Sequence, residues 1–106
     1  MDLGLTYKAL ASGQVDLIAG NSTDGLIDSL KLFVLDDDKH YFPAYEAVPL
    51  IRQEVVGKHP EVRRAFAGLA GKISDQAMRK MNYLVDGEHR NVSDVVREFL
   101  DSTQRT

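Results

Sequence analysis

Residues 13–25, with the sequence GQVDLIAGNSTDG, decide the expected fold. An apolar run over 15–19 is followed by Gly20 and by the turn-forming segment 21–25. Short apolar runs that end in turn residues are typical of buried parallel strands, and open α/β sheets bind ligands at the ends of such strands. We therefore predict a strand over 15–19 that leads into a candidate binding loop.

The residues on either side of this stretch extend the pattern of alternating helix and strand. Apolar residues recur at helical spacing over 2–12, and Gly13 stands where a helix C-cap glycine is common. After the loop, 26–30 predicts a short helix and 31–35 a second apolar strand. The order helix, strand, helix, strand indicates an α/β protein.

The second half of the chain predicts an extended connector followed by helices. Residues 39–45 contain aromatic residues and Pro43, and Pro49 limits a strand over 47–52 to an edge or an irregular position. Helices are predicted over three ranges, which are 61–70, 74–85 and 93–100. Ser74 is the expected N-cap of the second, and Asn91 or Ser93 that of the third. The sheet is small for its helices, which indicates that partner strands are missing or come from another copy.

Composition excludes several classes of protein. The chain has 106 residues, a net charge of -3 and no cysteine. Scattered basic residues argue against a nucleic-acid binder, and the lack of cysteine excludes disulfides and thiolate metal sites. No apolar run approaches the ~20 residues that span a bilayer. The first residues do not resemble an export signal, so we expect a cytoplasmic chain unless a signal lies upstream.

No motif for catalysis, a cofactor or a metal occurs in the sequence. There is no nucleophile elbow, no P-loop and no dinucleotide-binding fingerprint. The run 36–38 lacks the spacing of a calcium loop and is interpreted as a solvated charge run. His40, His59 and His89 are too far apart in sequence to suggest a metal site. We predict a protein that is not an enzyme and that needs no cofactor.

A set of short segments in a fixed order carries a resemblance to a known family. The segments are 5–10 (LTYKAL), 13–18 (GQVDLI), 22–25 (STDG), 34–39 (VLDDDK), 41–45 (YFPAY), 69–74 (LAGKIS) and 81–83 (MNY). They resemble the substrate-binding proteins of ABC importers for glycine betaine, choline and carnitine, and the likeness is to the last third of those longer proteins. The resemblance implies a partial type II periplasmic-binding-protein fold, with domain swapping as one way to complete the short sheet.

The same resemblance implies how the chain divides. Residues 1–38 would form the end of one lobe of a two-lobed protein. Residues 39–46 would be a hinge-like connector, and 47–106 the C-terminal helical part of the other lobe.

The ligand site implied by the resemblance is a cage of tyrosines around a quaternary ammonium group. Aromatic faces attract such a cation by roughly 0.5 to 2 kcal/mol per ring. One cage position corresponds to Tyr45, and another falls on Asn21, whose amide offers hydrogen bonds in place of an aromatic face. Ser22 and Thr23 are candidate polar contacts, with turn formation and helix capping as the alternative. For Tyr45 the alternative is packing beside Pro43.

Two functions from different classes follow. The first is a substrate-binding component for a small cationic or zwitterionic solute, which works with an ABC permease outside the cytoplasmic membrane, as the family does. The second is a short self-associating structural protein derived from such a binding protein. Both leave a homodimer as the expected state of this chain, because a hinge segment favours exchange of elements between copies.

Overall fold

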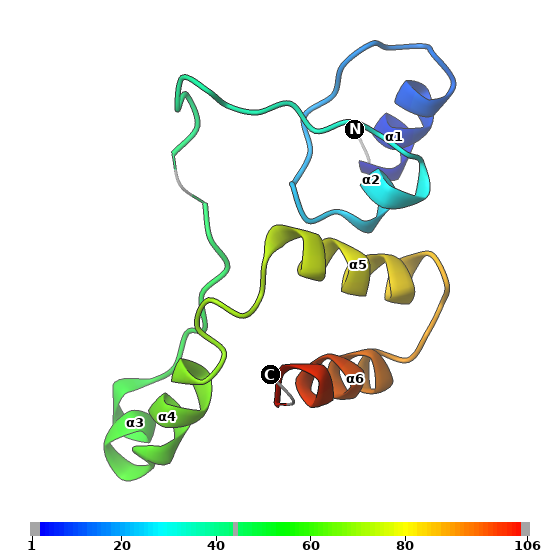
Figure 1. The fold of residues 1–106 in the computed structure, drawn as a ribbon. Coiled ribbons are helices and arrows are strands. Elements are labelled where there is room, and N and C mark those ends of the chain that lie inside the picture. Colours follow the sequence, from blue (N-terminus) through cyan, green and yellow to red (C-terminus); the bar gives the residue numbers. More distant parts are fainter. Residues whose placement is uncertain (1–2, 44, 105–106) are drawn as a thin grey trace. The chain divides into compact units, whose positions relative to one another are not determined.

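The computed structural model describes residues 3–43 and 45–104, and within them the regular structure is helical. The helices are α1 (Leu3–Ala11), α2 (Gly25–Ser29), α3 (Gln53–Lys58), α4 (Glu61–Ala67), α5 (Asp75–Asp86) and α6 (Val92–Gln104) (Figure 1). Predicted helices 2–12, 26–30, 61–70, 74–85 and 93–100 correspond to α1, α2, α4, α5 and α6.

The described residues contain no β-strand, so the predicted short sheet is not formed in this structure. Segments 15–19 and 31–35 lack regular structure, and so does the predicted edge strand over 47–52. The physical reason is that a strand exists through its hydrogen bonds to a neighbouring strand. An apolar run can have the composition of a buried strand and still find no partner within its own chain.

The chain forms two compact units, and the first joins residues 1–34 with 74–106. Within this unit α2 packs on α5, and α5 forms an antiparallel hairpin with α6 (Figure 1). The most buried apolar side chains are Tyr7, Ile27 and Val95, one each from α1, α2 and α6. The core therefore ties residues at the start of the chain to residues near its end.

Gly25 permits the close approach of α2 to α5. A Cβ atom added at Gly25 would lie 2.6 Å from the backbone nitrogen of Tyr83 and 2.8 Å from its Cα. Real Cβ atoms do not come so close to backbone, and the backbone of a helix cannot easily move away. The glycine at the end of the Ser-Thr-Asp-Gly segment is thus required by packing.

Helix ends carry the caps that the sequence predicts. Gly13 has φ +72°, and the amide of Gly13 donates to the Leu10 carbonyl while that of Gln14 donates to the Ala9 carbonyl. These two bonds form a Schellman motif after α1. The Ser74 hydroxyl accepts a bond from the Ala77 amide at the start of α5.

The sequence predicts either Asn91 or Ser93 as the N-cap of α6, and the hydrogen bonds at the start of this helix distinguish the two. The amide of Ser93 donates to Asn91 Oδ1 at 2.9 Å, so Asn91 is the N-cap.

The second unit, residues 35–73, contains the connector and two short helices. Helices α3 and α4 contact one another, and His59 lies between them with its ring 3.1 Å from the Glu61 carboxylate. Helix α3 was not predicted, because its six residues include Gly57 and have too few apolar positions to show a helical period.

The two units differ in extent from the three parts that the resemblance implies. In this structure residues 74–106 group with residues 1–34 in the first unit. The contacts that cause this grouping are those of α2 with α5. The division into 1–38, 39–46 and 47–106 describes the lobes of longer proteins, and for those lobes it stays a prediction.

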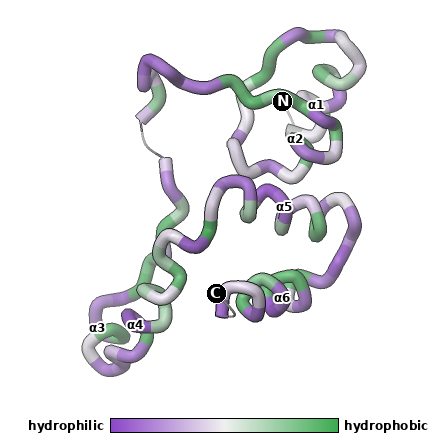
Figure 2. Tube along the Cα trace, viewed as in Figure 1, coloured by the Kyte–Doolittle hydropathy of each residue, from purple (hydrophilic) through white to green (hydrophobic). Residues whose placement is uncertain are grey.

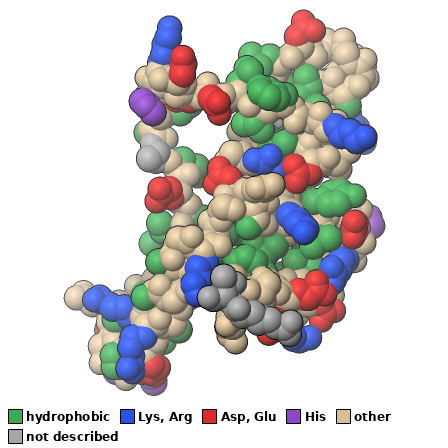
Figure 3. Space-filling view, in the orientation of Figure 1, with side chains coloured by type: hydrophobic (Ala, Val, Ile, Leu, Met, Phe, Trp, Pro, Cys, Tyr) green, Lys and Arg blue, Asp and Glu red, His purple; other side chains and the backbone are tan. Residues whose placement is uncertain are grey.

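Large apolar side chains are exposed in both units. Phe33 is 87% exposed in the first unit and Leu50 is 93% exposed in the second. Figure 2 shows a hydrophobic stretch in the chain just after α2, and Figure 3 shows hydrophobic side chains at the surface of the drawn face. Side chains of this size stabilise a fold mainly when they are buried, so these surfaces are suited to contact with further protein.

Candidate functional site

The loop 21–24 closes on itself before α2 begins. The amide of Asp24 donates to the Asn21 carbonyl at 3.1 Å, and the amide of Asn21 donates to Asp24 Oδ2 at 3.3 Å. The same Oδ2 atom accepts a 2.7 Å bond from the hydroxyl of Tyr7 on α1. Asp24 therefore holds the loop closed and joins it to the core.

Burial and Asp24 together change the acidity of Tyr7. The side chain is only 4% exposed, and burial disfavours its charged form. The hydrogen bond and the negative charge of Asp24 act in the same direction, and the pKa of Tyr7 rises to about 12. Tyr7 therefore stays a neutral hydrogen-bond donor throughout the physiological pH range.

Helix α5 holds the loop from the other side through three polar side chains. The Ser22 hydroxyl donates to Asp75 Oδ2 at 2.8 Å, and Arg79 Nε donates to the Ser22 carbonyl at 2.9 Å. Asn82 Nδ2 donates to the Thr23 carbonyl at 2.8 Å. Positions 75, 79 and 82 lie on one face of a helix because they are four and three residues apart. We call Asp75, Arg79 and Asn82 the α5 brace.

Arg79 also reaches past the loop to α2. Its NH1 atom lies 3.6 Å from Asp28 Oδ1, and its side chain is 20% exposed. One guanidinium group thus contacts both the loop before α2 and a carboxylate within α2.

The predicted site residues of the loop have different roles in this arrangement. Ser22 uses its hydroxyl for Asp75, so it neither caps α2 nor donates to another group. Thr23 is half-buried and is held through its carbonyl. Asn21 is exposed, and its side-chain amide has no hydrogen bond to any residue that the structure describes. Of the three, Asn21 has the side chain most available to a ligand.

Tyr45 belongs to the second unit. Its side chain is 95% exposed, so the alternative of packing beside Pro43 is not what the structure shows. Nothing in the described residues brings a second aromatic ring to it.

A turn before Tyr45 is held by Asp37. The carboxylate of Asp37 accepts bonds from the amides of Tyr41 and Phe42 at 2.9 and 2.8 Å. These two bonds lower the pKa of Asp37, because they stabilise its charged form. His40 adopts φ +51° within the turn. One of three consecutive aspartates in the predicted charge run thus has a specific structural role.

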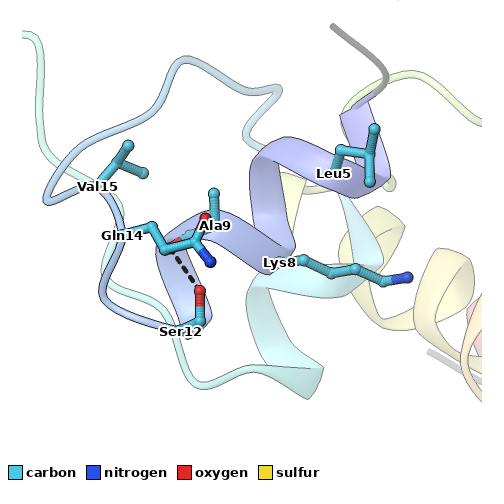
Figure 4. A pocket seen from close by; sticks show the side chains of 6 residues that line it. All are labelled: Leu5, Lys8, Ala9, Ser12, Gln14 and Val15. Atoms are coloured by element: carbon cyan, nitrogen blue, oxygen red, sulfur yellow. Dashed lines mark hydrogen bonds between the residues drawn. The ribbon is translucent and has the colours of Figure 1, made fainter.

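An open pocket of about 600 Å³ lies beside α1 (Figure 4). Its lining residues are Leu5, Lys8, Ala9, Ser12, Gln14 and Val15. The Ser12 hydroxyl is already bonded to the Ala9 carbonyl at 3.2 Å. The lining offers no aromatic ring and includes none of the four predicted site residues.

Two kinds of feature are absent from residues 3–43 and 45–104. They contain no group of three or more histidine, cysteine, aspartate or glutamate side chains placed to hold a metal ion. No helix in that part of the chain is both long and apolar enough to cross a membrane.

Sequence reasoning missed Tyr7 and the α5 brace. The polar residues at 75, 79 and 82 form a helical pattern of their own, which could have marked a polar face. Their partner could not be read in the same way, because the loop is 53 to 59 residues away in sequence.

Comparison with known proteins gives consistent relatives. The chain is 45% identical to the carnitine transport binding protein OpuCC of Listeria monocytogenes over 100 aligned residues. The aligned stretch is 94% of this chain and 32% of that protein. It is 42% identical to the glycine-betaine-binding protein of Pseudomonas aeruginosa over the same shares. A Helicobacter pylori protein named as an ergothioneine transport permease and binding protein is 37% identical over 95% of this chain and 18% of that protein. The chain thus spans about a third or less of these relatives.

Solved structures agree with the sequence comparisons. A crystal structure described as a glycine betaine/carnitine/choline ABC transporter matches this chain with a TM-score of 0.87 and 39% sequence identity. The match covers 98% of this chain and 38% of the chain in that crystal structure. The chain therefore has the fold of the matching part of a periplasmic-binding-type protein. Residues 1–102 match the family described as the substrate binding domain of ABC-type glycine betaine transport systems. The chain belongs to this family of transport binding proteins, which are not enzymes.

Proposed function

We propose that this chain is part of the substrate-binding component of an ABC importer for a quaternary-ammonium or related small zwitterionic solute. The observation that carries the proposal is the loop 21–24, which is held by hydrogen bonds from α1 and α5 while the side-chain amide of Asn21 has no hydrogen bond to the described residues. A rigid loop that presents a free polar group is what a binding site requires. The names of three relatives support the solute class, since carnitine, glycine betaine and ergothioneine are all betaines.

Tyr45 is the proposed aromatic contact for the ammonium group. Its ring is 95% exposed and has no packing role in its own unit, so it is free to meet a cation. Asn21 replaces an aromatic contact with hydrogen bonds, which suits a solute that carries a carboxylate or hydroxyl group. Ser22 and Thr23 would act through the shape of the loop.

The sheet, the partner and the location belong to the same proposal. Strands over 15–19 and 31–35 would form when further strands pair with them, from a longer chain or from a second copy that exchanges elements. The permease of the importer would be the protein partner, and the site of action would lie outside the cytoplasmic membrane.

The test is a calorimetric titration of a hybrid protein. This chain replaces the matching 100 residues of the Listeria carnitine transport binding protein, which supplies the remainder of the cleft. The hybrid should bind at least one of glycine betaine, choline and carnitine with a saturable isotherm. A folded hybrid that binds none of them, while the parent binds carnitine, contradicts the proposal.

The exposed apolar side chains favour a second candidate, a self-associating protein that binds no solute. Phe33 and Leu50 would then be buried between two copies. The solution mass of the chain, measured by light scattering, decides this point. A strict monomer at high protein concentration removes the second candidate and the homodimer with it.

A further inference from the structure

We infer that Arg79 and Asn82 are positioning residues, which set the geometry of the loop 21–24 and so control how Asn21 meets a solute. The inference rests on the proposed function for the solute and on the structure for the loop. It assigns a role in recognition to helix α5, whose side chains would not touch the solute.

Within the brace, Arg79 and Asn82 bond to the backbone of the loop, whereas Asp75 bonds to the Ser22 hydroxyl. Arg79 and Asn82 donate to the carbonyl groups of Ser22 and Thr23, which directly follow Asn21. Each peptide unit is a rigid plane, so a bond that fixes its carbonyl group fixes the orientation of the plane. Two such bonds therefore fix two consecutive peptide planes of the loop. The orientation of the loop therefore depends on where α5 places these two donors.

Two further contacts make Arg79 the central member of the brace. Its two partners, Asp28 and Ser22, lie on either side of Gly25 in sequence, and an added Cβ at Gly25 would be 2.6 Å from the Tyr83 backbone nitrogen on α5. A guanidinium group can make both contacts because its donors form a rigid planar fork. Lysine has one flexible ammonium group and cannot reproduce both.

The opposite side of the loop is anchored independently of α5. Asp24 accepts a bond from Tyr7, so the loop stays attached to α1 even without the brace. Loss of the brace should therefore loosen the loop, including the bonds between Asn21 and Asp24, and leave the unit folded. This separation makes a positioning role distinguishable from general packing.

The experiment measures amide hydrogen exchange by NMR in the full chain. The two hydrogen-bonded loop amides, Asn21 and Asp24, report on the loop, and the Val95 amide reports on α6. Arg79→Ala and Asn82→Ala should each speed exchange at the loop roughly tenfold, the effect expected for a lost hydrogen bond of this kind, with Val95 unchanged.

Matched controls lie on the same helix. Lys80→Ala removes a neighbouring positive charge, and Gln76→Ala removes an amide side chain. Neither residue makes a hydrogen bond to the loop among the described residues. Both controls should leave exchange at the loop unchanged. In Arg79→Lys, exchange at the loop amides should stay as fast as in Arg79→Ala, because lysine restores the positive charge without the planar fork of donors.

Three results would overturn the inference. They are unchanged loop amides in both brace variants, equal acceleration of exchange at Val95, and full restoration by Arg79→Lys. Unchanged loop amides would show that the brace does not hold the loop. Equal acceleration at Val95 would show that Arg79 and Asn82 only stabilise the packing of the whole unit. Full restoration by Arg79→Lys would show that the positive charge alone holds the loop.

A second readout separates this inference from the proposed function. In the hybrid protein, Arg79→Ala and Asn82→Ala should weaken solute binding several-fold, and the two controls should not. If the hybrid binds solute and the brace variants bind equally well, the positioning role is wrong and the function stands. If no solute binds, exchange in the full chain still decides whether the brace holds the loop.

Discussion

Replacement of Gly25 by alanine should destabilise the first unit by about 2 kcal/mol. Alanine gains up to about 1 kcal/mol in helix propensity over glycine, and less at the first position of α2. Against this gain, its Cβ would lie 2.6 to 2.9 Å from backbone atoms of α5. Overpacking costs about 1 to 3 kcal/mol, and contact with backbone places this site at the upper end. Packing therefore outweighs propensity.

The assay is urea unfolding followed by circular dichroism at 222 nm. Gly57→Ala is the matched control, because Gly57 also lies within a helix, α3, and an added Cβ there meets nothing within 4 Å. The control should be neutral or stabilising by up to about 1 kcal/mol. A Gly25→Ala chain as stable as the natural one would refute the close packing of α2 on α5.

Three further predictions concern local features. Tyr7→Phe should cost about 1 to 3 kcal/mol in urea unfolding, because Asp24 loses a donor. Folding raises the pKa of Tyr7 from 10.0 to about 12, so its contribution to the free energy of unfolding is complete below pH 10 and is lost as the pH rises through 12. Ultraviolet titration should show one tyrosine that ionises at higher pH than the others, and the Tyr7→Phe chain should lack it. Ser74→Ala should cost about 1 kcal/mol by loss of its cap, with Ser93→Ala near neutral. Gly13→Ala should destabilise the end of α1 by about 1 kcal/mol, seen as faster exchange at the Gln14 amide, because φ is +72° there.

Helices were predictable where the sequence contains their end signals. Gly13, Ser74 and Asn91 each mark a terminus through local hydrogen bonds, so a few residues are enough to locate it. Helix α3 lacks such a signal and was missed. The strands over 15–19 and 31–35 have the right composition, but pairing depends on a neighbour that composition cannot supply.

The candidate site was predictable as a loop and unpredictable as a network. Turn-forming residues located the loop 21–24, and family resemblance singled out Asn21 and Tyr45. The residues that hold the loop, Tyr7 and Arg79 among them, lie far away in sequence and contact it only through tertiary packing. No local rule connects such positions, so only the folded structure reveals them.

The central claim is that Tyr45 is an aromatic contact for a quaternary ammonium group. The most direct measurement is the calorimetric affinity of the hybrid protein for glycine betaine, with Tyr45→Ala compared against Tyr41→Ala. Tyr41 is a control from the same connector that is also highly exposed, at 83%. The claim predicts a loss of roughly 2- to 30-fold for Tyr45→Ala, the equivalent of one cation–π contact, and no change for Tyr41→Ala. Equal affinities for the natural hybrid and its Tyr45→Ala variant would contradict it.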